Sequence, residues 1–210
     1  MGHKNREIEV KLLVNDIKTL SSVACQIEKV WHAMDKHSEA DASEDYDNEI
    51  LVGNASDFYW NAPKGCNADF GRLRKRSGGG AQLTIKSTDR GDNVNRVEVD
   101  VDVDDHGQAY EFMTGLLGEP TAKVTKKYSV FFLENQHTNI SVYQIRGDDR
   151  VFVEVEAKTL KRVIQILNTV IDSTNYEYSW IKSSVYQMFV QKKQMVVKSV
   201  NDFLLKGSNQ

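Results

Sequence analysis

The sequence has few of the features that mark disulfide-rich, zinc-binding or membrane-spanning proteins. Its two cysteines, Cys25 and Cys66, lie far apart and in no Cys-x-x-Cys spacing, which argues against a disulfide framework and a zinc site. No apolar run approaches the roughly 18 residues of a membrane helix, and the N-terminus has no signal-peptide core. We therefore expect a cytoplasmic protein with no membrane partner.

Two common ligand motifs are also missing. The five histidines do not pair at i,i+4 spacing on a helix face, so a histidine-based metal site is not expected. The glycine-rich stretch Ser77–Gly80 lacks the Lys-Ser/Thr of a P-loop and predicts a hairpin turn instead, because glycine tolerates positive φ. With 27 basic and 30 acidic residues, the net charge of −3 gives no general attraction to nucleic acid. Any anion site must come from local sorting of charge.

Charge is sorted along the expected strands. In Glu7–Lys11, charged and β-branched residues alternate, so the two carboxylates and the ammonium share one face of a strand. Charged residues recur on one face in two basic segments, Gly71–Arg76 and Gln82–Lys86, and in two acidic ones, Asn95–Val103 and Arg150–Ala157. A merely solvated sheet needs no such separation of signs, which indicates that these faces converge on a common site.

Helices are expected between the groups of strands. Apolar residues at helical spacing predict one helix capped by Asn15 or Asp16 and another that starts at Asp104 or Asp105. A third helix is expected over Leu160–Ile171. Terminal helical material is expected between Val185 and Leu204, including Val196 and Val197, and an acidic surface loop over Asp35–Asn48. The remaining expected strands are Asp57–Trp60, Ala122–Leu133 and Asn139–Ile145.

These elements predict an α+β fold, because the strands come in hairpin-connected groups rather than alternating with helices. A closed antiparallel β-barrel of about eight strands satisfies the pattern, with amphipathic helices packed outside on the apolar faces and the charges pointing inward. The alternative is a barrel whose interior charges have only a structural role and pair with one another. So many buried ion pairs are costly without a ligand to organise them.

From Glu7 to about Phe189, the chain resembles the CYTH domain, also called the triphosphate tunnel metalloenzyme fold. The motifs that carry the resemblance occur in the family's order: Glu7-x-Glu9-x-Lys11, Asp57-x-Tyr59, Arg72-x-Arg74, Lys86, Arg96-x-Glu98, Lys126 and Phe152-x-Glu154-x-Glu156. The resemblance implies an eight-stranded tunnel in a CYTH-like domain over residues 1–193, followed by a C-terminal helical tail over residues 194–210. Members include class IV adenylyl cyclases, thiamine triphosphatases and inorganic triphosphatases.

The resemblance also implies roles for individual residues. The expected ligands of Mg²⁺ or Mn²⁺ are Glu7, Glu9, Glu154 and Glu156. The expected catalytic residues are Lys11, Arg72, Arg74 and Arg96, and the same four would bind phosphate oxygens together with Lys86 and Lys126. Two positions depart from the family pattern, since Tyr128 stands where an arginine is usual and Tyr143 where many members have an aspartate.

Elementary electrostatics favours the same ligand. A triphosphate carries about four negative charges, which arginine forks and lysine ammonium groups bind well. Clustered glutamates would repel one another unless a cation lay between them, and hard oxygen ligands suit Mg²⁺ or Mn²⁺. The sequence leaves open whether the chain forms a homodimer.

We therefore expect a metal-dependent phosphohydrolase that acts on inorganic tripolyphosphate, thiamine triphosphate or a nucleoside triphosphate. Two alternatives stay open. One is a class IV adenylyl cyclase that converts ATP to cyclic AMP and pyrophosphate. The other is a catalytically degraded polyphosphate or nucleotide binding protein, which the two tyrosines suggest.

Overall fold

The computed structural model describes residues 5–16, 18–35, 50–66, 68–89, 92–135 and 138–207. The acidic loop expected over Asp35–Asn48 lies outside these residues except for Asp35. The side chains of Glu7 and Arg96 lie outside the description as well, although their backbones are placed in strands. None of the helices within the described ranges is long and apolar enough to cross a membrane.

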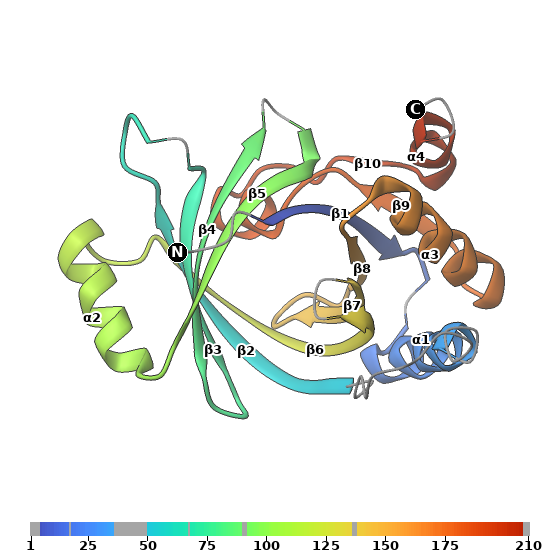
Figure 1. Ribbon diagram of the computed structural model, residues 1–210, viewed down its shortest axis with the longest axis horizontal. Helices are drawn as coiled ribbons and strands as arrows, with labels where there is room; N and C mark the ends of the chain where they lie inside the picture. Colours follow the sequence, from blue (N-terminus) through green and yellow to red (C-terminus); the bar gives the residue numbers. More distant parts are fainter. Residues whose placement is uncertain are drawn as a thin grey trace.

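The strands form one antiparallel sheet whose order brings it back to its first strand. Strand β1 pairs with β8 along one edge, and its other edge pairs first with β5 and then with β9. The order β1-β5-β4-β3-β2-β6-β7-β8 therefore returns to β1 and encircles an interior (Figure 1). The strands are β1 (Asn5–Val14), β2 (Ile50–Asn61), β3 (Phe70–Arg76), β4 (Ala81–Asp89), β5 (Asp92–Val103), β6 (Ala122–Asn135), β7 (Thr138–Ile145), β8 (Val151–Ala157), β9 (Tyr178–Ile181) and β10 (Val197–Ser199).

This topology confirms the expected α+β fold and its eight-stranded antiparallel ring, with two further strands outside the ring. Strand β9, with the sequence Tyr-Ser-Trp-Ile, is rich in β-forming residues and takes the edge of β1 that β5 leaves unpaired. Strand β10 then pairs with β9.

The helices cover the outside of the ring. Helices α1 (Leu20–Asp35) and α3 (Leu160–Ser173) pack on strands β6, β7 and β8, whose outward residues form the largest apolar core with them. Helix α2 (His106–Leu117) packs on β3 over a smaller core that contains Trp60 and Leu73. A short α4 (Val200–Gly207) contacts α3 and β9, and a π-helical turn, η2 (Tyr186–Val190), contacts β6. The inward faces of the strands are thereby left for polar residues.

Helix caps agree with the sequence in one case and differ in another. Helix α2 is capped by Asp105, which accepts the backbone N–H of Gln108 at 3.0 Å, as predicted. The first helix begins later than predicted, with Thr19 Oγ1 accepting the N–H of Ser22 at 3.2 Å. Asn15 does not cap this helix, because its Oδ1 accepts a hydrogen bond from Ser179 Oγ at 2.7 Å.

Two further boundaries correct the sequence-based expectation. Val197 lies in strand β10, and neither it nor Val196 is helical, so η2 and α4 are separate elements. Strand β2 begins at Ile50, well before the predicted Asp57. Its first half contains weak β-formers such as Gly53, and pairing with β6 on one side supplies the hydrogen bonds that hold it extended.

Candidate functional site

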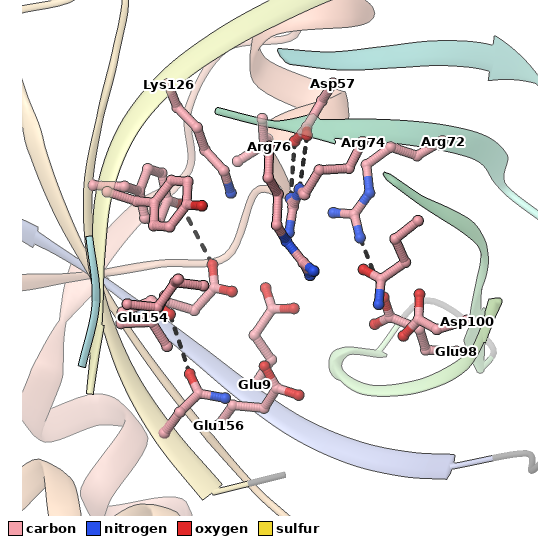
Figure 2. Close-up of a pocket in the computed structure, with 18 of the residues that line it drawn as sticks. Glu9, Asp57, Arg72, Arg74, Arg76, Glu98, Asp100, Lys126, Glu154 and Glu156 are labelled. Atoms are coloured by element: carbon pink, nitrogen blue, oxygen red, sulfur yellow. Dashed lines mark hydrogen bonds and ion pairs between the residues drawn. The ribbon is translucent and has the colours of Figure 1, made fainter. Parts of the chain in front are cut away.

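The ring encloses a cavity of about 640 Å³, to which every one of its eight strands contributes inward side chains. Figure 2 shows Lys126 and the β3 arginines across this space from Glu9, Glu154 and Glu156, with Asp57, Glu98 and Asp100 beside the arginines. All the predicted site residues whose side chains are described line this one cavity: Glu9, Lys11, Arg72, Arg74, Lys86, Lys126, Glu154 and Glu156. The backbones of Glu7 and Arg96 lie opposite each other where β1 meets β5, and the roles of their side chains remain predictions.

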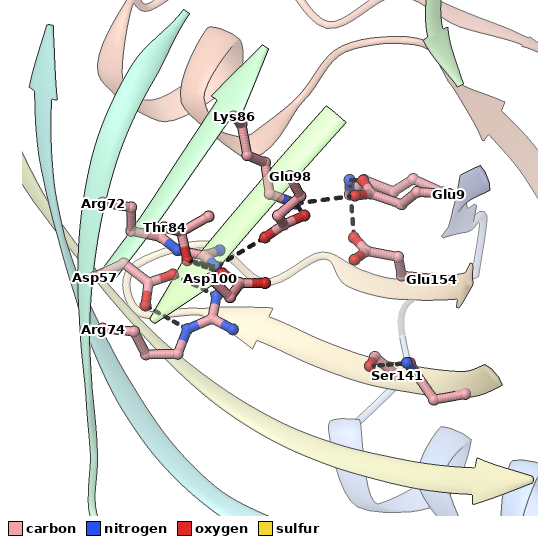
Figure 3. A network of polar contacts seen from close by, with 12 residues as sticks. Glu9, Asp57, Arg72, Arg74, Thr84, Lys86, Glu98, Asp100, Ser141 and Glu154 are labelled. Carbon is pink, nitrogen blue, oxygen red and sulfur yellow. Dashed lines mark hydrogen bonds and ion pairs between the residues drawn. The ribbon is translucent and has the colours of Figure 1, made fainter. Parts of the chain in front are cut away.

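The carboxylate side is organised around a buried lysine. The Nζ atom of Lys11 lies 2.8 Å from an oxygen of Glu9 and 2.8 Å from an oxygen of Glu154, so one ammonium bridges strands β1 and β8 (Figure 3). Burial and the nearby Glu9 carboxylate would raise the pKa of Glu154, but Lys11 and Lys126 outweigh them and hold it below its usual value. Glu154 is therefore anionic and shares the Lys11 ammonium with Glu9.

The same carboxylates have the chemistry of a hard-metal site. Glu156 lies directly opposite Glu9 in the β1–β8 register and lines the cavity with it. Across the described ranges, no three histidine, cysteine, aspartate or glutamate side chains are grouped closely enough to hold an ion as they stand. Glu9 and Glu154 nevertheless already share a cation, the Lys11 ammonium, and oxygen donors of this kind suit Mg²⁺ or Mn²⁺.

On the basic side, Arg74 is held in place by an aspartate. Its Nε and Nη2 atoms donate to the two carboxylate oxygens of Asp57 at 2.7 and 2.9 Å, across the β2–β3 pair. Asp57 is only 1% exposed. Burial alone would raise its pKa, but the charge and hydrogen bonds of Arg74 more than offset this and hold the pKa well below its usual range. The sequence motif contained Asp57 without showing this role.

Arg72 is anchored at one end of its guanidinium only. Its Nη2 donates to Thr84 at 2.8 Å and lies 3.5 Å from Glu98, while its Nε is buried with no hydrogen-bond partner among the described residues. Thr84 in turn donates to Asp100. Sequence reasoning assigned none of these three supporting residues, although the period of two from Lys86 places Thr84 on the inward face of β4.

Two lysines of the basic side differ in their pairing. Lys86 lies 2.5 Å from Glu98 and 3.4 Å from Glu9, so it links the basic and acidic strands. Lys126 has no ion-pair partner among the described residues, and its Nζ lies 5.0 Å from the centroid of the Tyr143 ring. Burial, followed by repulsion from Arg74, lowers the pKa of Lys126 to about 7. Lys126 is thus a cation that an incoming anion would stabilise.

The two tyrosines that depart from the family pattern both line the cavity. The hydroxyl of Tyr143 donates to Glu154 at 3.4 Å. Burial and the negative charge of Glu154 raise the pKa of Tyr143 well above its usual value, so it stays a neutral donor. Tyr128 lies next to Tyr143 across the β6–β7 pair. An uncharged pair of rings therefore stands where charged side chains were expected.

Residues from the π-helical turn η2 and the segment before it also line the cavity, and the sequence did not predict them. The ring of Tyr186 stacks on Phe70 with centroids 4.5 Å apart, and its hydroxyl donates to Asn61 at the end of β2. Ser184 and Val185 line the same region. The turn was expected only as helical material, because its apolar spacing carries no sign of which element it would face.

Comparisons with known proteins show the fold. No family model and no curated protein matches the chain. Among solved structures, "Putative adenylyl cyclase HpAC1 from Hippeastrum reveals a dominant triphophatase activity" is 13% identical with a TM-score of 0.58, covering 90% of this chain and 97% of that one. A "putative adenylate cyclase" from Vibrio parahaemolyticus is 16% identical, with a TM-score of 0.53 and coverage of 80% and 90%.

A conserved hypothetical protein from Pyrococcus furiosus is 18% identical with a TM-score of 0.55, covering 78% of this chain and 90% of that one. The likeness to these three structures extends over most of both chains in each case. Together with the eight-stranded ring, it confirms the fold that the resemblance to CYTH domains implies.

Proposed function

We propose that this chain, which has the fold of the CYTH domains, is a metal-dependent phosphohydrolase that cleaves a triphosphate bound inside its ring of strands. The observation that carries the proposal is that basic and acidic side chains converge on one cavity. Arginines and lysines from β3, β4 and β6 line it together with glutamates from β1 and β8. The description of the Hippeastrum protein as having a dominant triphosphatase activity supports the same class of reaction.

We further propose that Glu9, Glu154 and Glu156, with Glu7, hold Mg²⁺ or Mn²⁺ on the carboxylate side. Such an ion neutralises phosphate oxygens and activates a water nucleophile. Lys11 already bridges Glu9 and Glu154 at 2.8 Å, so these carboxylates are arranged to share a cation. Inorganic tripolyphosphate, thiamine triphosphate and a nucleoside triphosphate are all within the proposed substrate range.

The basic side would bind and orient the phosphates. Asp57 fixes the plane of the Arg74 guanidinium, which lowers the entropy lost when that fork binds an anion. Arg72 has a buried Nε without a hydrogen-bond partner among the described residues, and a phosphate oxygen would satisfy it. Positive groups placed in this way stabilise the charge that develops on the transferred phosphoryl group.

A binding protein without turnover is the second candidate, and one arrangement favours it. The Lys11 ammonium lies between Glu9 and Glu154, and the Tyr143 hydroxyl donates to Glu154 as well. In this arrangement, oxygens needed for a metal are engaged by the protein itself. Such a protein would bind triphosphate and be stabilised by it without releasing a product.

Product analysis separates these functions. The protein is incubated with tripolyphosphate, thiamine triphosphate or ATP, with Mg²⁺, with Mn²⁺ or with EDTA. A hydrolase releases orthophosphate and accepts tripolyphosphate, which has no ribose, and we expect this result. Cyclic AMP with equal amounts of pyrophosphate would identify a cyclase, whereas thermal protection without any product would identify a binding protein.

A further inference from the structure

Three neighbouring strands, β2, β6 and β7, present only two charged groups to the cavity among their described residues, Asp57 and Lys126. The inward residues of β2, β6 and β7 in this region are apolar, aromatic or neutral polar, and we call them the uncharged wall: Leu51, Tyr128, Val130, Phe132, Asn139 and Ser141. In contrast, inward positions of β3, β5 and β8 in the same cavity carry arginine, aspartate or glutamate.

The strand register places this wall in rows next to the phosphate-binding lysine. Along β6, the inward residues after Lys126 are Tyr128 and Val130, each step being roughly 7 Å. In the register, Tyr128 lies between Gly53 of β2 and Tyr143 of β7. A group attached to a phosphate bound at Lys126 therefore reaches Tyr128, roughly 7 Å further along β6.

Glycine at position 53 makes room for the tyrosine. A Cβ atom at Gly53 would lie 3.2 Å from the Tyr128 hydroxyl oxygen and 3.0 Å from Ser77 Oγ. Both distances are tighter than ordinary van der Waals contact, so a side chain here would displace Tyr128 or Ser77. The missing side chain at Gly53 thus leaves room for the hydroxyl end of Tyr128 beside β2.

An inorganic triphosphate gains nothing from such a wall. Apolar and aromatic surface does not replace the hydration of phosphate oxygens, whereas it stabilises a planar ring by stacking and burial. The cavity of about 640 Å³ also falls within the range of roughly 300–1,000 Å³ that is typical for drug-sized ligands. Neutral polar groups at Asn139 and Ser141, which hydrogen-bond each other at 3.1 Å, add donors and acceptors beside Glu156 and Glu154, their register partners on β8.

We propose that the uncharged wall binds the planar heteroaromatic group of an organic triphosphate, with Tyr128 as the residue that selects it over inorganic tripolyphosphate. This inference rests on the proposed function, because it assumes that the phosphates bind at Lys126, Arg72 and Arg74. It assigns the tyrosine a role in specificity in place of the phosphate contact that an arginine would make there. A nucleobase and the rings of thiamine are the two sources of such a group.

The test is a set of binding measurements that need no turnover. Titration calorimetry in EDTA compares ATP, thiamine triphosphate and tripolyphosphate on the wild type, Tyr128→Ala, Tyr128→Phe and Lys127→Ala. The last changes the exposed neighbour on the outer face of β6 and is the matched control. We expect Tyr128→Ala to weaken binding of at least one organic triphosphate by about 10-fold, as expected for a lost stacking contact, and tripolyphosphate by less than about twofold.

Tyr128→Phe keeps the ring and should keep the affinity. Loss for ATP alone identifies a nucleobase, and loss for thiamine triphosphate alone identifies the thiamine rings. Equal weakening of all three ligands by Tyr128→Ala, or no change for any of them, would overturn the inference while leaving triphosphate binding intact. Absence of tripolyphosphate binding by the wild type both in EDTA and with Mg²⁺ would instead overturn the proposed function, and this inference with it. Thermal unfolding of each variant verifies that it is folded.

Discussion

Strands β3 and β6 flank β2 on its two sides, yet they present different chemistry to the same cavity. Strand β3 has arginine at three successive inward positions, and two of these, Arg72 and Arg74, are held by partners on neighbouring strands. Strand β6 has one lysine that lines the cavity, Lys126, followed on that face by Tyr128 and apolar residues. The β3 side is organised before any ligand arrives, whereas the charge on β6 depends on the ligand. The two proposed tasks, electrostatic binding of the phosphates and selection of the organic group, therefore fall on different strands.

The test with the largest expected effect removes single glutamates of the proposed metal site. Glu9→Ala and Glu154→Ala should each reduce turnover by roughly 1,000-fold, because each removes a proposed metal ligand whose loss costs several kcal/mol of transition-state stabilisation. Initial rates of orthophosphate release measure the effect. Glu111→Ala, on the exposed face of α2, is the control and should keep full activity. Undiminished rates in excess EDTA would show that no metal is involved.

A second test breaks the preorganisation of β3. Asp57→Asn should lower the free energy of unfolding by about 3–5 kcal/mol, because it leaves the Arg74 guanidinium without its buried partner. Denaturant titration measures this change. In Asp148→Asn the partner Arg150 is 41% exposed, so a loss under about 1 kcal/mol is expected there. Equal losses in the two variants would contradict the buried role of Asp57.

The difference in stability between the wild type and Asp57→Asn has a defined pH dependence. The pKa of Asp57 is lower in the folded protein than its ordinary value of 3.8. Its contribution to stability is therefore complete above that value and is lost as the pH falls through the folded pKa. The stability difference between the wild type and Asp57→Asn should be fully present at about pH 5 and shrink in acid below about pH 3.8. A difference that grows as the pH falls below this value would have the wrong sign.

A third test concerns the ligand-dependent lysine of β6. The pKa of Lys126 is lowered from 10.5 to about 7, so the folded protein loses this proton as the pH rises through neutrality. Relative to Lys126→Arg, which stays charged, wild-type affinity for tripolyphosphate should fall by about 10-fold between pH 6 and pH 8, the worth of one charged hydrogen bond. Using the ratio of the two proteins cancels the titration of the ligand itself. A ratio that does not change with pH would place Lys126 away from the phosphates.

The smallest expected effect probes the space beside Tyr128. Gly53→Ala should weaken binding of the organic triphosphate by a few fold, because its Cβ would lie 3.2 Å from the tyrosine hydroxyl. Tripolyphosphate affinity should stay the same, since the phosphate side is untouched. Calorimetry on Gly53→Ala in the background of Tyr128→Phe, which has no hydroxyl, should show a smaller effect. An undiminished effect there would mean that Gly53 acts through Ser77 instead.

The sequence predicted the ring of strands and the membership of the cavity well. Alternation alone fixes which residues of a strand share a face, so Glu9 and Lys11 were correctly expected to point the same way, as were Arg72 and Arg74. The first part of β2 was not predicted, because its extended form depends on pairing with β6 rather than on the propensity of residues such as Gly53.

Pairing inside the cavity could not be predicted, since it depends on register between strands that are distant in sequence. Asp57 meets Arg74, and Lys11 meets Glu154, only because of the observed alignments of β2 with β3 and of β1 with β8. The chain position of Tyr186 likewise gave no sign that its ring would stack on Phe70. Residue types thus indicated the chemistry of the site, and tertiary structure decided its partners.

The pairing of β1 with β8 has a consequence for how the protein is made. The first strand leaves the ribosome about 140 residues before its partner, a delay of roughly 7–28 s at usual rates of synthesis. During that time its edge is open, and the alternating charges of Glu7–Lys11 protect it against pairing with other chains. A chain that stops before β8 lacks Glu154, so Lys11 loses one of the two carboxylates that it bridges. The proposed metal side of the cavity is therefore complete only after translation has passed the last strand of the ring.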